Sequence, residues 1–302
     1  MALARLGFQL PDFTRIVWSS PRARDIWQPR LDRMRTAWAE VERLAVIRGI
    51  QRVAMQMVSS TGLSGLEDDL VRTGIYAVPL QKCATGQTFT STIQEAAECS
   101  QFLYWTAIGR AEAVKATKAA FEANDQEALC RLRGYPDCCA RFYQEHWVNQ
   151  RSIDLTWPMA ENTGSVLSRG ENRIELRSVP ACNVMLRWLG PRMVYHLPCR
   201  FDCPATASLA SWFAEIAHDA GFDEELAWLE DALHWPLEWS ALHGIAEIKS
   251  PIARFCTRTD ASAVRYVLRV LGDRYPEEGA KAESFPYQSS SDCSIVTYCT
   301  ES

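Results

Sequence analysis

No stretch of this 302-residue sequence is apolar for long enough to cross a lipid bilayer. The first segment, residues 1–29, is interrupted by charged residues and proline, so it lacks the apolar centre of an export signal. These interruptions include Arg5, Pro11, Asp12, Arg15 and Arg22. We therefore expect no signal peptide, no transmembrane helix, no association with membranes, and a cytoplasmic location.

An excess of positive charge is also missing. Lysine and arginine total 32 against 37 aspartate and glutamate residues, which gives a formal net charge of -5. Proteins with a general affinity for nucleic acid present a basic face that displaces counterions from phosphates. The composition therefore argues against general nucleic-acid binding, while a local basic patch stays compatible with it.

The better-known catalytic signatures are absent as well. The sequence contains no phosphate-binding P-loop, no dinucleotide fingerprint, no nucleophile elbow, and no C-x3-C-x2-C motif of the radical S-adenosylmethionine kind. These absences direct attention to the cysteines and to clusters of polar residues.

Cysteine is plentiful, with 11 residues. The number is too small, in a chain of this length, for a disulfide scaffold of the small secreted type. Without an export signal, reduced thiols and metal ligation are the better expectation. The apolar share of 47% is enough to bury a core in one large domain or two smaller ones.

Two cysteine pairs stand beside turns. Cys138 and Cys139 follow a Gly-Tyr-Pro-Asp segment that begins at Gly134, and Cys199 and Cys203 lie on a turn flanked by prolines. Thiolates at a loop-to-helix junction are oriented and partly deprotonated by the helix N-terminus, which favours anionic ligands. We predict that the two pairs converge on one metal site.

Three interpretations of these cysteines stay open, namely an iron–sulfur cluster, a structural zinc ion, and buried thiols without metal. We favour a [4Fe–4S] cluster, because the C-x3-C spacing of Cys199 and Cys203 is less usual for zinc than C-x2-C. The adjacent side chains of Cys138 and Cys139 are expected to diverge, so that only one of them is a ligand. A cluster held by three thiolates would leave one iron open to substrate, hydroxide or sulfide.

Other residues could complete this site. His196 lies three residues before Cys199 and is either a ligand, a residue that orients a ligand from outside, or a structural histidine. Cys83 and Cys182 stand beside turn residues and are candidate reserve ligands or sulfur carriers. Arg258, in a Thr-Arg-Thr-Asp run, is suited to bind an anionic or hydroxylated cofactor or ligand.

A second polar cluster follows Trp235. His243 and Glu247 are four residues apart, so a helix would place them on one face, and Glu238 precedes them. This arrangement is typical of a general acid or base with an orienting carboxylate. The alternative is a surface turn with solvated charges.

Hydrophobic periodicity predicts a mixed, helix-rich α/β or α+β fold with a central sheet of short strands. Helical periodicity occupies residues 29–48, 94–124, 125–133, 183–189, 204–220 and 223–233, with Pro29 in the first turn of its helix. Apolar alternation predicts strands over residues 152–157, 173–179, 192–197 and 245–252. Residues 50–58 read as a strand or a helix end, and residues 262–271 as the helix that follows the strand or extended segment at 245–252.

The same patterns suggest a division of the chain. Residues 1–133 form a helix-rich N-terminal part, and residues 134–287 form an α/β part that carries the cysteine motifs. The two parts can equally form one continuous domain. Residues 288–302 are rich in serine and are expected to be a mobile tail.

The motifs Gly-Tyr-Pro-x-Cys-Cys and His-x-Pro-Cys-x3-Cys resemble those of a family of uncharacterised cysteine-containing bacterial and archaeal proteins. The resemblance covers mainly residues 134–206, with residues 238–259 as a further candidate region. It supplies no established activity, but it implies an iron–sulfur protein in which the two motifs share one site. Arg200 departs from the small polar residue expected at that position.

Together these features favour an enzyme that uses an open cluster iron as a Lewis acid or sulfide carrier on a small-molecule substrate. Such an iron–sulfur dependent lyase or sulfur transferase would suit a specialised biosynthetic pathway. One alternative is a non-catalytic zinc-binding protein with a structural or regulatory role. The other is a subunit that binds a protein or peptide partner.

Overall fold

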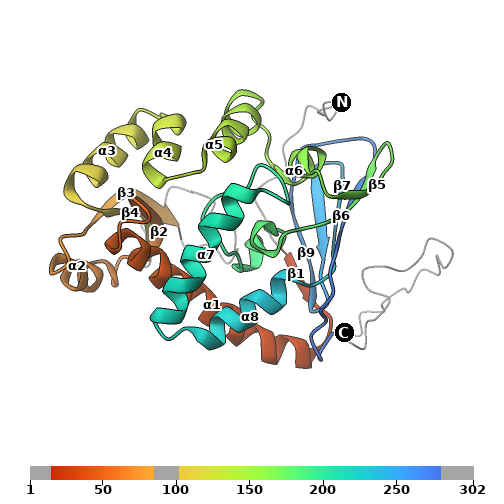
Figure 1. Cartoon of the computed structure of the whole chain (residues 1–302), viewed down its shortest axis with the longest axis horizontal. Coiled ribbons are helices and arrows are strands. Elements are labelled where there is room, and N and C mark those ends of the chain that lie inside the picture. The colour runs from red at the N-terminus through yellow and green to blue at the C-terminus, as the bar shows by residue number, and fades with distance from the viewer. Residues whose placement is uncertain (1–14, 85–101, 280–302) are drawn as a thin grey trace.

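Two β-sheets organise the chain in a computed structural model that describes residues 15–84 and 102–279 (Figure 1). The larger sheet has seven strands in the order β1-β9-β8-β7-β10-β6-β5. These strands are β1 (Arg15–Trp18), β5 (Val166–Arg169), β6 (Arg173–Arg177), β7 (Leu237–Leu242), β8 (Ile245–Lys249), β9 (Ala253–Arg258) and β10 (Tyr266–Leu271). Neighbouring strands are antiparallel except β10 and β6, which run parallel.

The smaller sheet is antiparallel and consists of β2 (Val53–Ser59), β4 (Phe102–Gly109) and β3 (Tyr76–Ala84), in that order. Side chains alternate between its two faces, as expected for strands. Val53 and Met55 pack with α3 (Ala111–Glu122) and α4 (Gln126–Arg133). Ala54 packs on the opposite face with the end of α1 (Pro21–Ile47) and with α2 (Leu63–Val71).

Helix α1 is the main helical support of the core. Its buried residues recur every three or four positions, which is the spacing of one helical face. The helix over residues 29–48 is confirmed, but it begins eight residues earlier, and the prediction that Pro29 lies in its first turn is wrong. Ser20 caps the helix by accepting a hydrogen bond from Ala23 N–H, and Pro21 occupies the first turn. Pro29 costs one internal hydrogen bond, which burial of Trp27 and Leu31 on either side offsets.

The remaining helices lie between α4 and β7 in the sequence. They are α5 (Asp137–Tyr143), a π-helix over Gln144–Asn149, α6 (Thr156–Asn162), α7 (Pro204–Asp219) and α8 (Asp223–Leu233), with 3-10 turns at Pro180–Cys182 and Arg187–Leu189. Figure 1 shows α7 between the two sheets. Its buried side chains Phe213 and Ile216 belong to the same core cluster as Trp239 of β7. No helix in the described ranges combines the length and apolarity that a membrane crossing requires.

The mixed, helix-rich fold with a central sheet of short strands is confirmed. The helices over residues 125–133, 204–220 and 223–233 are confirmed, as are the strands over 173–179 and 245–252. Of residues 50–58, those from Val53 onward lie in strand β2, and residues 183–189 contain only a 3-10 turn.

Four further element predictions are wrong in the described residues. Residues 102–109, expected in a helix, form strand β4. Their aromatic and β-branched residues favour a half-buried strand. The helix was predicted because the spacing of the apolar residues also fits a helix. Residues 152–157, expected as a strand, lead into α6. Residues 192–197 form no strand, and residues 262–271 end in strand β10 instead of a helix.

The division at residue 133 stays a prediction. The N-terminal part contributes β1 to the larger sheet, where it pairs with β9, and it contributes α1 to the main core. The helical residues expected at 94–101 and the tail at 288–302 lie outside the described residues.

Candidate metal centre

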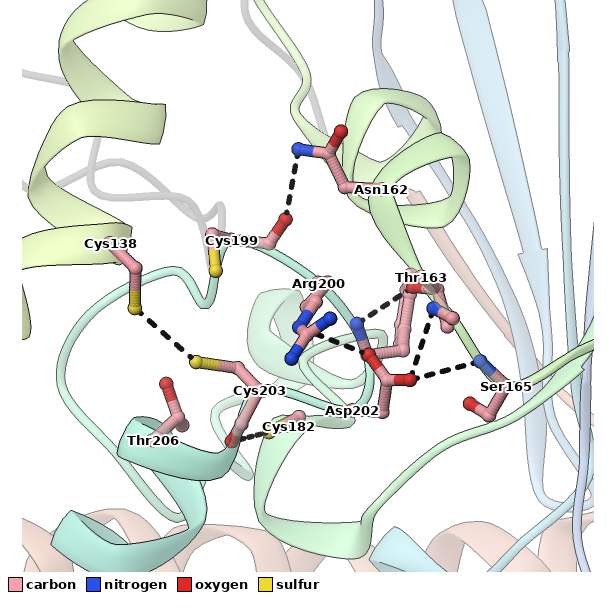
Figure 2. Close-up of polar contacts among 12 residues, drawn as sticks. Cys138, Asn162, Thr163, Ser165, Cys182, Cys199, Arg200, Asp202, Cys203 and Thr206 are labelled. Carbon is pink, nitrogen blue, oxygen red and sulfur yellow. Dashed lines mark hydrogen bonds and ion pairs between the residues drawn. The ribbon is translucent and has the colours of Figure 1, made fainter.

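Cys138, Cys139, Cys199 and Cys203 meet in one cluster, with all four sulfur atoms within 4.8 Å of one another. The Cys203 sulfur lies 3.7 Å from the sulfurs of both Cys138 and Cys139, which are 3.8 Å apart. Figure 2 shows Cys138 approaching from one side and Cys199 and Cys203 from the facing loop. The convergence of the two cysteine pairs is therefore confirmed, and the cluster could hold a metal ion.

The first pair is positioned by the junction between α4 and α5. Gly134 ends α4 with a left-handed φ of 77°, which glycine adopts without strain. Pro136 then precedes the first turn of α5. Helical side chains lean toward the helix N-terminus, so Cys138 and Cys139 both point at the space above that turn. The prediction that their side chains diverge is wrong, because the two sulfurs are 3.8 Å apart and both side chains lean in the same direction.

The second pair lies on a loop held by the end of α6. The Phe201 N–H donates to Thr163 Oγ1 over 2.9 Å, and the Asn162 side-chain amide donates to the Cys199 carbonyl over 3.4 Å. Cys203 occupies the N-cap position of α7, and Pro204 occupies the first turn. The loop is thus fixed on one side by α6 and on the other by α7.

Asp202 anchors the same loop through its carboxylate. One oxygen accepts the N–H groups of Gly164 and Ser165 at 3.0 and 2.9 Å. The other lies 3.3 Å from the Arg200 Nε (Figure 2). Arg200, the residue that departs from the resembled motif, is therefore paired with a carboxylate inside its own loop.

Burial distinguishes the four ligand candidates. Cys139 and Cys203 are fully buried, whereas Cys138 and Cys199 are partly exposed. Cys182 is also fully buried and donates its thiol to the Cys203 carbonyl over 3.4 Å. It therefore supports the backbone of a ligand from behind, and burial raises its pKa to about 12.

The pKa values of the neighbouring thiols shift in opposite directions. Hydrogen bonds from Cys139 and Cys199 hold the pKa of Cys203 well below that of an ordinary thiol. The pKa of Cys139 is raised, first by its hydrogen bonds to Cys199 and Cys203 and then by burial. Because four adjacent negative thiolates would repel one another, a bound cation would compensate the charge that the cluster develops.

His196 lies behind the sulfur cluster. Its Nε2 is 2.9 Å from Thr206 Oγ1, and that hydroxyl is 3.5 Å from the Cys139 sulfur. Burial, followed by the nearby Arg133 guanidinium, lowers the pKa of His196 to about 3 and keeps the ring neutral. Of its expected roles, this geometry matches orientation of a ligand from outside. Sequence reasoning missed Thr206, which lies three residues after Cys203 in the first turn of α7.

The helix expected around His243 is absent, and that prediction is wrong. β7 and β8 form a hairpin whose turn is His243-Gly244, with φ values of 51° and 83°. Two successive positive φ values are typical of a tight hairpin turn. His243 is exposed at this tip, so it has no apolar surroundings to exclude water. Its catalytic role stays a prediction, but the helical face that His243 was expected to share with Glu247 does not exist.

Glu238 and Glu247 lie on the sheet and are engaged in ion pairs. Lys249 Nζ is 3.3 Å from Glu238 and 3.6 Å from Glu247, and the Arg269 Nε is 2.8 Å from Glu238. Arg258 lies on β9, where it is paired with Ile245 of the neighbouring strand β8. Glu238, Glu247 and Arg258 do not belong to the sulfur cluster. Cys83 lies in β3, where its thiol donates to the Gln81 backbone carbonyl.

Comparisons of the chain with protein-family models, with curated proteins and with solved structures found no match. The chemistry of the site therefore rests on its own residues. The resemblance of the two cysteine motifs to an iron–sulfur family stays a prediction.

Proposed function

We propose that this protein binds one tetrahedrally coordinated metal ion, zinc by preference, through Cys138, Cys139, Cys199 and Cys203. The spacing of the sulfur atoms is the observation that supports this proposal. The residue set is also chemically suitable, because thiolates are preferred ligands of zinc.

A tetrahedral zinc ion sets a definite distance between its ligands. With zinc–sulfur bonds of about 2.3 Å, the sulfur atoms at the corners of the tetrahedron are about 3.8 Å apart. Three sulfur pairs in this cluster are separated by 3.7, 3.7 and 3.8 Å, and no pair exceeds 4.8 Å. Zinc would therefore need only a small adjustment of the fourth ligand, Cys199.

A [4Fe–4S] cluster makes a different demand. Each cysteine sulfur binds its own iron at a separate corner of the cubane, so the sulfurs are about 6 Å apart. The cysteines would have to separate by about 2 Å to admit it. Adjacent Cys138 and Cys139 are the hardest pair to spread in this way. The cluster spacing thus favours a single ion over the iron–sulfur interpretation.

The proposed zinc ion has a structural role. Four protein thiolates complete its coordination and leave no position for a substrate, which is the pattern of structural sites. The ion would join α5 to the loop before α7, two segments that are distant in the sequence. It would thereby hold α5 against that loop in a small cysteine cluster beside the main core, against which Cys199 packs.

Partial exposure of Cys138 and Cys199 favours one second candidate. From that side a small molecule could reach a cluster iron, as the lyase or sulfur transferase hypothesis requires. In that case the cysteine loop must open when the cluster is assembled.

Metal analysis of protein purified without oxygen separates the two candidates. We expect one zinc per chain, no iron and no visible absorbance, and Cys203→Ser should abolish the zinc. Four irons per chain with broad visible absorbance would replace the zinc proposal by the cluster. Protein without either metal, and unable to take up zinc when reduced, would reject both.

A further inference from the structure

A threonine hydroxyl connects the buried ligand Cys139 to His196. Thr206 Oγ1 lies within hydrogen-bonding distance of both the Cys139 sulfur and His196 Nε2. Thr206 is fully buried and His196 is only 3% exposed. A hydroxyl has a single proton, so Thr206 can donate to only one of these two partners.

The second nitrogen of the His196 ring indicates which partner receives that proton. Nδ1 is shielded from solvent, and it makes no hydrogen bond with residues 15–84 or 102–279. A buried N–H without an acceptor is rarer in proteins than a lone pair without a donor. The single proton of the neutral ring is therefore expected on Nε2. His196 then donates to Thr206, and the hydroxyl proton of Thr206 is directed to Cys139.

We propose that His196 and Thr206 are positioning residues of the metal site, forming a one-way hydrogen-bond chain from Nε2–H through Oγ1–H to the Cys139 thiolate. The chain fixes the direction of the sulfur lone pairs and draws charge away from this ligand. The inference rests on the metal site proposed above and adds residues that act on it without touching the ion.

The position of Thr206 strengthens this arrangement. It lies in the first turn of α7, three residues after Cys203, and Figure 2 shows the two residues side by side. One helical turn therefore supplies a ligand of its own and a hydrogen bond to a ligand from α5. Residues that orient metal ligands in this way typically change metal affinity by about 10–100-fold when they are substituted.

Two substitutions of Thr206 test the donor. Thr206→Val keeps the shape and removes the hydroxyl, whereas Thr206→Ser keeps it. Zinc affinity is measured by chelator competition, and the sulfur-to-metal charge-transfer band is measured after Co²⁺ replaces zinc. We expect Thr206→Val to weaken zinc binding by about 10–100-fold and to move the band to lower energy, because the thiolate loses its hydrogen bond. Thr206→Ser should restore both properties. An unchanged band in Thr206→Val, or no recovery in Thr206→Ser, would overturn the proposal.

The direction of the chain is tested at His196 by ¹⁵N NMR of the metal-free protein. We expect the Nε2–H tautomer, and finding the Nδ1–H tautomer would refute the one-way chain. His196→Gln retains a donor near the position of Nε2 and should bind zinc more tightly than His196→Leu, whereas equal affinities would count against it. If the wild-type protein binds neither zinc nor Co²⁺, the proposed function fails, while the tautomer still decides whether the chain exists.

Discussion

The sulfur atom of Cys138 lies 3.7 Å from that of Cys203, although 65 positions separate the two residues in the sequence. Neither residue is held there by the other, because α4 and α5 place Cys138 while α6 and α7 place Cys203. In the proposed metal site, the fold would thus arrange the ligands before the metal binds. Such preorganisation reduces the entropy that ligand ordering costs on binding.

Each single substitution of a ligand by serine should therefore remove most of the bound metal. We expect Cys138→Ser and Cys139→Ser to behave alike, since both sulfurs belong to the cluster. Metal content and chelator competition provide the measurement. Cys256→Ser, on strand β9, is the control and should keep full occupancy. If Cys138→Ser kept full metal occupancy while the other three variants lost the metal, only three thiolates would bind it.

Removal of the metal should destabilise the folded protein. A ligand present at a thousand times its dissociation constant contributes about 4 kcal/mol to the free energy of unfolding. We expect a chelator to lower the melting temperature of the wild-type protein in calorimetry, and to leave that of Cys203→Ser unchanged. A wild-type melting temperature that does not respond to the chelator contradicts a structural ion.

Loss of the Asp202 carboxylate should loosen the cysteine loop. Asp202→Ala removes the acceptor that the exposed N–H groups of Gly164 and Ser165 share, and since water can replace it, a loss of about 0.5–1.5 kcal/mol in unfolding free energy is expected for each hydrogen bond. Metal affinity should fall with it. Asp219→Ala is a matched control, because Asp219 also pairs with an arginine but on an exposed surface, where about 0.5 kcal/mol is expected. Equal effects of both variants in urea denaturation would show that the loop does not depend on Asp202.

A buried ion pair away from the metal should be among the most sensitive positions. Asp154 accepts hydrogen bonds from Arg187 at 2.9 Å and from the Trp239 indole at 3.0 Å. Asp154→Ala strands the buried guanidinium and should lower the free energy of unfolding by about 3–5 kcal/mol. Asp25→Ala, at an exposed pair with Arg24, should change it little. Urea denaturation measures both, and a small loss for Asp154→Ala would mean that Arg187 finds another partner.

The hairpin tip should tolerate substitution without loss of metal. His243 has a positive φ and precedes Gly244, and asparagine followed by glycine is a favoured pair for such turns. We expect His243→Asn to retain the metal and to raise the free energy of unfolding by a few tenths of a kcal/mol to about 1 kcal/mol. Metal loss on this substitution would place His243 at the site after all.

The sequence predicts helices and cysteine pairs better than it predicts hairpins. Pro204 at the start of α7 and Gly134 at the end of α4 are local signals, and they identified these helices and both cysteine turns. The helical face predicted for His243 and Glu247 rests on their four-residue spacing, which is compatible with a helix. The hairpin turn instead depends on the positive φ values of His243 and Gly244, and hydrophobic periodicity does not indicate these. Thr206 was missed because its importance arises from Cys139, which only tertiary structure brings near.

Strand β1 has a consequence for the order in which the molecule is built. It is the first described element to leave the ribosome, yet its partner β9 is made near the end of synthesis. Helix α1 follows β1 directly and buries its tryptophan-rich face against elements that are also made later. The nascent chain must therefore carry an unpaired strand and an uncovered apolar helix through most of translation. A fragment that ends before β9 would expose both surfaces, and unpaired strand edges and uncovered apolar surfaces are prone to aggregation.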